Sequence, residues 1–191
     1  MRRLLVVCGL ALGGALVLVS RSTATAAERA AALPGDALVP APPITTTRAI
    51  SIVTPPTAVG PWIAQLGQGR GGFYSHAWLE NLIGCRIQNA AVIHPEWQSL
   101  AEGDEIRMHP DAPPLVVREV RPPQALVLGE PGVQSWAFVL EDAGAGRTRL
   151  LVRSRGSFGL PRWLAPLLEP GHAVMERAML RGIRDRAEGR V

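Results

Sequence analysis

The stretch 65–84 holds the residue types best suited to chemistry or binding. Gly67, Gly69 and Gly72 free the backbone for sharp turns, and they satisfy the spacing of a dinucleotide-binding loop. Such a loop needs a strand before it and a phosphate-binding helix after it. The apolar residues before these glycines recur instead at helical spacing, at Val59, Trp62, Ile63 and Leu66. We therefore expect a turn between two helices and no nucleotide site.

Cysteine and histidine form no catalytic or metal-binding pattern. Cys8 lies in an apolar N-terminal run, so Cys85 has no partner for a disulfide in the rest of the chain. A packed small side chain is favoured at Cys85 over a nucleophile that works with His76 or His94. The four histidines lack metal-ligand spacing, at His76, His94, His109 and His172. We expect no catalytic residue, no metal and no cofactor.

Polar and aromatic side chains close to the glycines suit the mouth of a ligand cavity. Arg70 and Tyr74 are candidates to hydrogen-bond the polar end of a ligand, with Trp78 as an aromatic neighbour. A structural role is the alternative. In that case Arg70 pairs with Glu80 or Glu96, and Tyr74 covers the edge of a sheet.

The N-terminus has the features of an export signal. Arg2 and Arg3 precede an apolar run over residues 4–19, and Ala24-Thr25-Ala26 resembles a cleavage site. The run is also nearly long enough to span a membrane. Residues 1–26 are therefore expected to be a signal peptide or an uncleaved membrane anchor. Either one places the rest of the chain outside the cytoplasm, exported or tethered to the membrane.

The charge balance argues against nucleic acid as a partner. The chain has 20 Lys+Arg, all of them arginine, against 16 Asp+Glu. Three of these arginines flank the apolar run, which leaves 17 basic against 16 acidic residues in the remainder. No cluster of basic residues follows a path that would match a phosphate backbone.

Two kinds of segment precede the main strand region. Residues 27–44 are rich in alanine and proline, with four prolines between 33 and 43, and this composition predicts an extended tether. The folded domain is then expected to cover 45–191. It starts with the β-branched strand TTTRAISIV, and two short helices follow, at about 55–66 and 75–83.

The second half alternates between short strands and turn residues. Strands are predicted at 105–109, 115–120, 125–129, 135–141 and 147–155. Trp136 and Phe138 share one strand face, and Arg153 and Arg155 share another that we expect to be solvated. With the first strand, these segments predict an antiparallel sheet of about six or seven strands.

The C-terminal segment predicts a long amphipathic helix from about Pro170. Its apolar stripe consists of Val174, Met175, Ala178, Met179 and Ile183. Such a helix needs an apolar partner, and the alternating strands offer one. The predicted fold class is therefore α+β, with the sheet packed on this helix.

This order of elements resembles the helix-grip fold of the START-like superfamily, also called SRPBCC. The superfamily contains polyketide cyclases, lipid-transport proteins and the Bet v 1 allergens, and the stretches GQGRGGFYS and EPGHAVMER are similar to bacterial members with an N-terminal membrane segment. The resemblance extends over about residues 33–187. It implies a curved sheet around the C-terminal helix and a cavity between them. The implied lining includes Trp136, Phe138, Met175 and Met179, for which plain core packing is the alternative.

The resemblance predicts binding of a hydrophobic small molecule or lipid in that cavity. One alternative is an enzyme of the polyketide cyclase or dehydratase type, which an ionisable pair converging inside the cavity would favour. A second alternative is a non-catalytic structural or partner-binding module, which a filled core would favour. The sequence predicts contact with a membrane through the N-terminal segment only.

Overall fold

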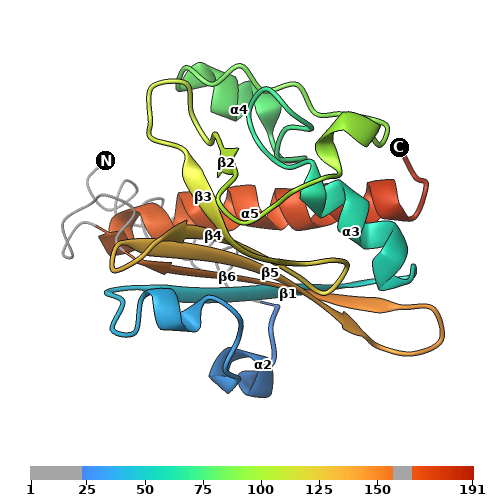
Figure 1. The fold of residues 1–191 in the computed structure, drawn as a ribbon, viewed down its shortest axis with the longest axis horizontal. Coiled ribbons are helices and arrows are strands. Elements are labelled where there is room, and N and C mark those ends of the chain that lie inside the picture. The colour runs from blue at the N-terminus through green and yellow to red at the C-terminus, as the bar shows by residue number, and fades with distance from the viewer. Residues whose placement is uncertain (1–22, 157–164) are drawn as a thin grey trace, which may run out of the picture.

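The computed structural model describes residues 23–156 and 165–191 (Figure 1). Within these residues six strands form one antiparallel sheet, in the order β1-β6-β5-β4-β3-β2. The strands are β1 (Thr45–Ile52), β2 (Glu105–Ile106), β3 (Leu115–Arg121), β4 (Ala125–Glu130), β5 (Gln134–Asp142) and β6 (Thr148–Gly156). Helix α5 (Ala165–Ala187) lies along one face of the sheet. The predicted α+β helix-grip fold is confirmed.

Short hairpins build most of the sheet. Strands β3 to β6 pair with their neighbours in sequence order, and β1 returns to pair with β6 from Thr45 opposite Arg155 to Ile52 opposite Thr148. The register between β3 and β4 shifts between Val117 and Glu119. Such a bulge increases the local twist and bends the strand, which helps the sheet to curve around a helix.

Alternation along β5 and β6 makes the main core, as the sequence predicted. Phe138 and Leu150 point to the concave face, where they pack with Met179 and Ile183 of α5 in one buried cluster. Each of these side chains contributes about 1.5 to 3 kcal/mol when it is fully removed from water. The helix begins five residues before the predicted start, because Pro170 lies inside it rather than at its first turn.

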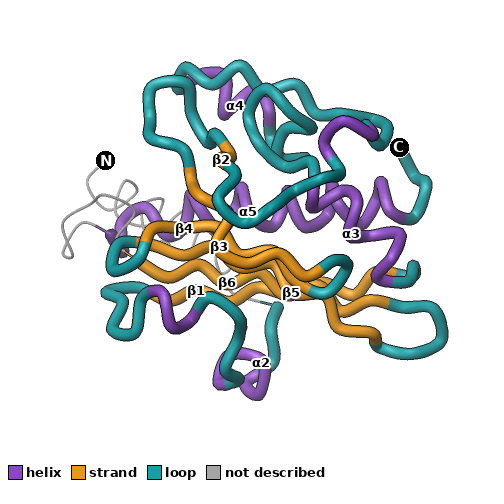
Figure 2. The backbone as a smooth tube through the Cα atoms, viewed as in Figure 1, coloured by secondary structure: helices purple, strands orange, loops and turns teal. Residues whose placement is uncertain are grey.

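Two short helices, α3 (Pro56–Ala64) and α4 (Ala77–Leu82), lie on the same side of the sheet as α5 (Figure 2). Long loops connect them to each other and to β2. The loop between them approaches α5 very closely at Gly182, where an added Cβ would lie 2.0 Å from the carbonyl oxygen of Tyr74. The packing of this loop therefore requires glycine at position 182.

The segment that we expected to be an extended tether lies on the convex face of the sheet. It contains α2 (Ala26–Ala30) and a short 3-10 helix, η1 (Asp36–Leu38), opposite α5 in Figure 1. Thr25 and Glu28 form a capping box, in which the Glu28 N–H donates to Thr25 Oγ1 at 3.1 Å and the Thr25 N–H donates to Glu28 Oε2 at 2.6 Å. Ala24 and Leu33 pack with two convex-face residues, Ala49 and Leu151.

Arginine side chains hold this segment on the sheet. Arg153 is only 2% exposed, so the expected solvated face is wrong at this position. Its five N–H donors all have acceptors, which are Thr47 Oγ1, Asp36 Oδ2 and the carbonyl oxygens of Glu28, Arg29 and Ala31. Three of these acceptors are backbone carbonyls of the N-terminal segment. The proline-rich composition of that segment does not predict such hydrogen bonds.

The apolar run 4–19 of the predicted signal peptide or anchor (residues 1–26) lies outside the described residues. In the ranges 23–156 and 165–191, no helix combines the length and the apolar character needed to cross a membrane.

Candidate functional site

A cavity of about 340 Å³ lies between α5, the concave face of the sheet and the segment that carries α4. This volume falls at the lower end of the range for small-molecule sites. Five parts of the chain line it: Phe73, Ser75 and Glu80; Met108, Ala112, Pro113 and Leu115; Gln134, Ser135 and Trp136 of β5; Ser154 of β6; and His172, Met175, Glu176 and Met179 of α5. The cavity is therefore mostly apolar, with a few polar groups from different elements.

The lining becomes more exposed toward one end. Pro113 is exposed, and Ala112, His172 and Met175 are half-buried. These more exposed residues belong to the β2–β3 loop and to α5.

Glu176 is the centre of a buried polar network on the α5 side of the cavity. It is 3% exposed and forms an ion pair with Arg48, which is 1% exposed and also pairs with Glu169. Glu176 Oε1 accepts hydrogen bonds from Trp136 Nε1 at 3.2 Å and from Ser154 Oγ at 3.0 Å. These donors offset the cost of removing the carboxylate from water.

The helical and strand repeats explain why these side chains meet. His172, Glu176 and Met179 are spaced by four and three residues, so they share one face of α5. His172 Nε2 lies 4.0 Å from Glu176 Oε1. Arg48 alternates with Thr47 and Ala49 along β1, so it points to the concave side while they point to the convex side.

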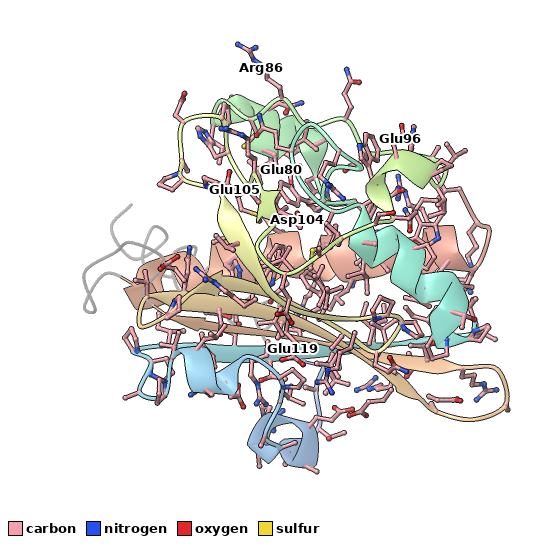
Figure 3. All side chains as sticks on the ribbon, in the orientation of Figure 1. Glu80, Arg86, Glu96, Asp104, Glu105 and Glu119 are labelled. Atoms are coloured by element: carbon pink, nitrogen blue, oxygen red, sulfur yellow. The ribbon has the colours of Figure 1, made fainter. Side chains whose placement is uncertain are left out.

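Glu80 supplies a second carboxyl group from the α4 side of the cavity. It is 8% exposed and lies on the inner side of α4, whereas Arg86 extends away from the molecule (Figure 3). Ser75 Oγ donates to Glu80 Oε1, and Glu80 Oε2 has no hydrogen-bond partner among the described residues. Burial raises the pKa of Glu80, and the Ser75 hydrogen bond and the nearby His76 counteract this only in part.

Cys85 behaves as the sequence predicted, as a packed side chain. It is buried, and its Sγ lies 3.9 Å from the carbonyl oxygen of Met108. Burial and the neighbouring Glu80 raise the pKa of the Cys85 thiol. The reactive thiolate is therefore disfavoured, and the geometry does not support a nucleophile at this position.

Three of the seven predicted cavity residues line the cavity: Trp136, Met175 and Met179. Phe138 lies behind Trp136 in the core, with their ring centroids 4.6 Å apart. Trp78 is 70% exposed on the outer side of α4 and does not line the cavity. Contact of any of these residues with a ligand stays a prediction.

Arg70 and Tyr74 are used inside the protein, although not with the partners that we considered. Arg70 Nη2 donates to the carbonyl oxygens of Ala64 at 2.9 Å and Trp97 at 3.0 Å. The Tyr74 hydroxyl donates to the Trp62 carbonyl at 3.1 Å, and burial raises the pKa of Tyr74 to about 12. Neither residue lines the cavity.

The half-buried side-chain amide of Asn89 positions the loop that enters the cavity. Asn89 Oδ1 accepts from the backbone N–H of Phe73 at 3.2 Å and of Tyr74 at 2.7 Å, and Asn89 Nδ2 donates to the Ser75 carbonyl at 3.1 Å. These bonds stabilise Tyr74 at φ 56°, a left-handed conformation that is costly for a bulky residue. The turn directs Phe73 and Ser75 into the cavity. No pattern in the sequence indicates this role of Asn89.

A second cavity of about 300 Å³ lies between α3 and the β3–β4 hairpin. Its described lining includes Pro61, Leu100, Pro123 and Leu126, and it contains no ionisable side chain. It offers an apolar volume without the convergent polar groups of the first cavity. We therefore regard the first cavity as the candidate site.

Comparisons with known proteins give similarity at the level of solved structures only. No family model matches the chain, and no curated protein matches it. A protein of Nitrosomonas europaea aligns with 12% identity and a TM-score of 0.48, over 78% of this chain and 97% of that one. The self-sacrificing resistance protein CalC of Micromonospora echinospora aligns with 13% identity and a TM-score of 0.47, over 76% and 94%. A polyketide-cyclase-like protein of Corynebacterium glutamicum aligns with 13% identity and a TM-score of 0.38, over 80% and 87%.

Proposed function

We propose that this protein binds a hydrophobic small molecule, or the apolar part of a lipid, in the cavity between α5 and the sheet. The observation that carries the proposal is the cavity of about 340 Å³ lined by Phe73, Trp136 and three methionines. Methionine adapts to irregular apolar shapes. Empty apolar volume destabilises a fold, so a cavity of this size beside buried polar groups favours an occupant over a filled core.

Titration of the full-length chain with N-phenyl-1-naphthylamine, a neutral apolar fluorescent probe, tests this proposal. We expect one saturable site. Met175→Trp places a bulky ring at the half-buried end of the cavity and should weaken binding about tenfold or more. Leu100→Trp adds the same ring to the second cavity and should leave the affinity unchanged. No saturable binding by the folded protein, or sensitivity to Leu100→Trp alone, would reject the candidate site.

A second candidate function is proton-transfer catalysis on a carbonyl-bearing chain, as in a cyclase or dehydratase. Ionisable groups approach this cavity from both sides, Glu80 from α4 and His172 and Glu176 from α5. A neutral acid opposite a base is the arrangement that enolisation requires. Incubation with a synthetic poly-β-ketone thioester should then give a dehydrated, cyclised product by mass spectrometry. His172→Ala should lose that product and still bind the substrate, and absence of product from the wild type would reject catalysis on this substrate.

We also propose that residues 1–26 are a signal peptide or a membrane anchor, as their composition predicts. Thr23 and Thr25 contact the domain, Thr23 Oγ1 through the backbone of Ala49 and Thr25 as the cap of α2. Cleavage at Ala26 would remove these contacts, so an uncleaved anchor is favoured. Fractionation and N-terminal sequencing test this. Full-length protein in the membrane fraction is expected, and a mature chain that starts near Ala27 would contradict the anchor.

A further inference from the structure

We infer that the cavity selects a ligand that carries a hydrogen-bond acceptor, such as the carbonyl oxygen of a ketone, ester or thioester, and that Glu80 donates the hydrogen bond to it. The inference rests on the proposed function, because it assigns the polar group within the same cavity. It identifies Glu80 as a specificity residue that the sequence pattern did not reveal.

The geometry around Glu80 leaves one of its oxygens open. Ser75 Oγ donates to Oε1, while Oε2 is buried without a partner among the described residues. Both residues line the cavity. A buried polar atom without a partner costs free energy, so the site favours a ligand group that can form a hydrogen bond with it.

On the opposite side of the cavity, both oxygens of the Glu176 carboxylate already have donors. Glu176 Oε1 accepts from Trp136 and Ser154, and its Oε2 pairs with Arg48. This carboxylate already has its donors and is charged in the ion pair. A polar ligand group therefore finds its open partner at Glu80 rather than at Glu176.

The protonation of Glu80 decides which ligand chemistry fits. Burial in an apolar cavity favours the neutral acid, since it raises the pKa of this group. Among the described residues, the titratable groups that surround it or line the same cavity are His76, Cys85, His172 and Glu176. A neutral acid donates an O–H, so it binds a carbonyl oxygen. An anionic ligand group would meet the charged Glu176 and a cationic one would need an ionised Glu80, so a neutral acceptor fits best.

Two matched probes test this inference in the full-length chain. The first is 6-propionyl-2-(dimethylamino)naphthalene, whose ketone accepts a hydrogen bond. The second is 6-propyl-2-(dimethylamino)naphthalene, which has the same ring and chain length without the ketone. We call the second compound the hydrocarbon probe, because its chain lacks the ketone. Its affinity, corrected for the difference in partitioning of the two probes into cyclohexane, gives the affinity expected for the ketone without a specific hydrogen bond. We expect the wild type to bind the ketone about tenfold more tightly than this value.

Two substitutions of Glu80 separate the effect of its hydrogen-bond donor from the effect of its side-chain volume. Glu80→Gln keeps an N–H donor and should retain the ketone preference to within about threefold. Glu80→Leu removes the donor and should abolish the preference. Unchanged affinity for the hydrocarbon probe shows that each variant still folds around an intact cavity. A ketone preference that survives Glu80→Leu would overturn the inference.

The pH dependence gives an independent readout. The ketone preference should be present while Glu80 is protonated and decrease as the pH rises through its raised pKa. The Glu80→Gln variant retains His76, Cys85, His172 and Glu176, so any pH dependence from those groups should remain in it. Loss of the wild-type slope in this variant supports the inference, and an identical slope contradicts it. If neither probe binds to the wild type, the proposed function fails; if both bind without a ketone preference, only this inference fails.

Discussion

The two faces of the sheet each bury an arginine, and the two arginines are used differently. Arg153 of β6 lies on the convex face, where all five of its donors have acceptors in the N-terminal segment or in β1. Arg48 of β1 lies on the concave face, where it pairs with Glu169 and Glu176, while its Nε has no hydrogen-bond partner in the part of the chain that the structure describes. On the convex face every N–H donor of the buried arginine has an acceptor, whereas on the concave face the buried arginine lies beside a cavity.

This difference separates a structural contact from a site. On the convex face, Arg153 holds the backbone of the N-terminal segment against the sheet. All of its donors are used in these contacts, so none is available to bind a ligand. On the concave face, the ion pair of Arg48 stands next to about 340 Å³ of apolar volume and the open Glu80 Oε2. Buried polar groups occur on both faces, and an unsatisfied polar atom beside empty volume on the concave face is the basis for placing the proposed site there.

The largest expected effects come from removing either arginine. Arg153→Met and Arg48→Met should each lower the free energy of unfolding by about 3 to 5 kcal/mol near neutral pH, because each leaves buried partners unpaired. Denaturant unfolding measures both values. A loss below about 1 kcal/mol for Arg153→Met would show that the N-terminal segment is not held as described.

A smaller effect is expected for the second ion pair of the convex face. Arg149 Nε and Nη2 donate to Glu28 Oε1 and Oε2 at 2.7 and 3.0 Å. The hydrogen bond from Arg149 is the main cause that lowers the pKa of Glu28 from 4.5 to about 2. The stabilisation is therefore complete above pH 4.5 and is lost as the pH falls toward about 2.

Glu28→Gln should accordingly cost about 1 kcal/mol near neutral pH, a value reduced for solvent screening. The difference between variant and wild type in urea unfolding should vanish near the folded-state pKa of about 2. A difference that grows as the pH falls would contradict the assigned sign. Affinity for the apolar probe should not change, because Glu28 lies on the face opposite the cavity.

The smallest expected effect concerns Trp78, which the sequence placed in the cavity. Because its side chain is 70% exposed, Trp78→Ala should change the free energy of unfolding by less than about 0.5 kcal/mol. Binding of N-phenyl-1-naphthylamine should also stay the same. A marked loss of affinity in fluorescence titration would show that the probe contacts the outer side of α4 instead of binding within the cavity.

The fold was predictable because it follows from repeats within the sequence. The alternation of Trp136, Phe138 and Leu140 and the stripe through Met175 and Met179 both appear in the buried core or the cavity wall. The segment 27–44 was not predictable in this way. Its prolines indicated an extended tether. However, Thr25 and Glu28 have the spacing of a capping box, and this pattern could have predicted the start of α2.

The candidate site was only partly predictable because it depends on side chains that meet across long sequence distances. Arg48 and Glu176 are 128 residues apart, and no local pattern links them. Glu176 did give a signal, since it is an acidic residue four positions after His172 and three before Met179, on the buried face of the helix. Arg70 and Tyr74 were predicted to bind a ligand at the cavity mouth, but they donate to backbone carbonyls inside the protein. Polar residues near a glycine turn can have either role, and the sequence does not distinguish the two.

Methyl NMR of the methionines tests the central claim most directly. The chain has four methionines, and three of them, Met108, Met175 and Met179, line the cavity. With ¹³C-labelled methionine methyl groups, N-phenyl-1-naphthylamine should shift all three assigned signals with one common dissociation constant, and intermolecular nuclear Overhauser effects should connect them to the probe. Saturable binding that leaves these three methyl signals unchanged would show that the ligand site lies elsewhere in the molecule.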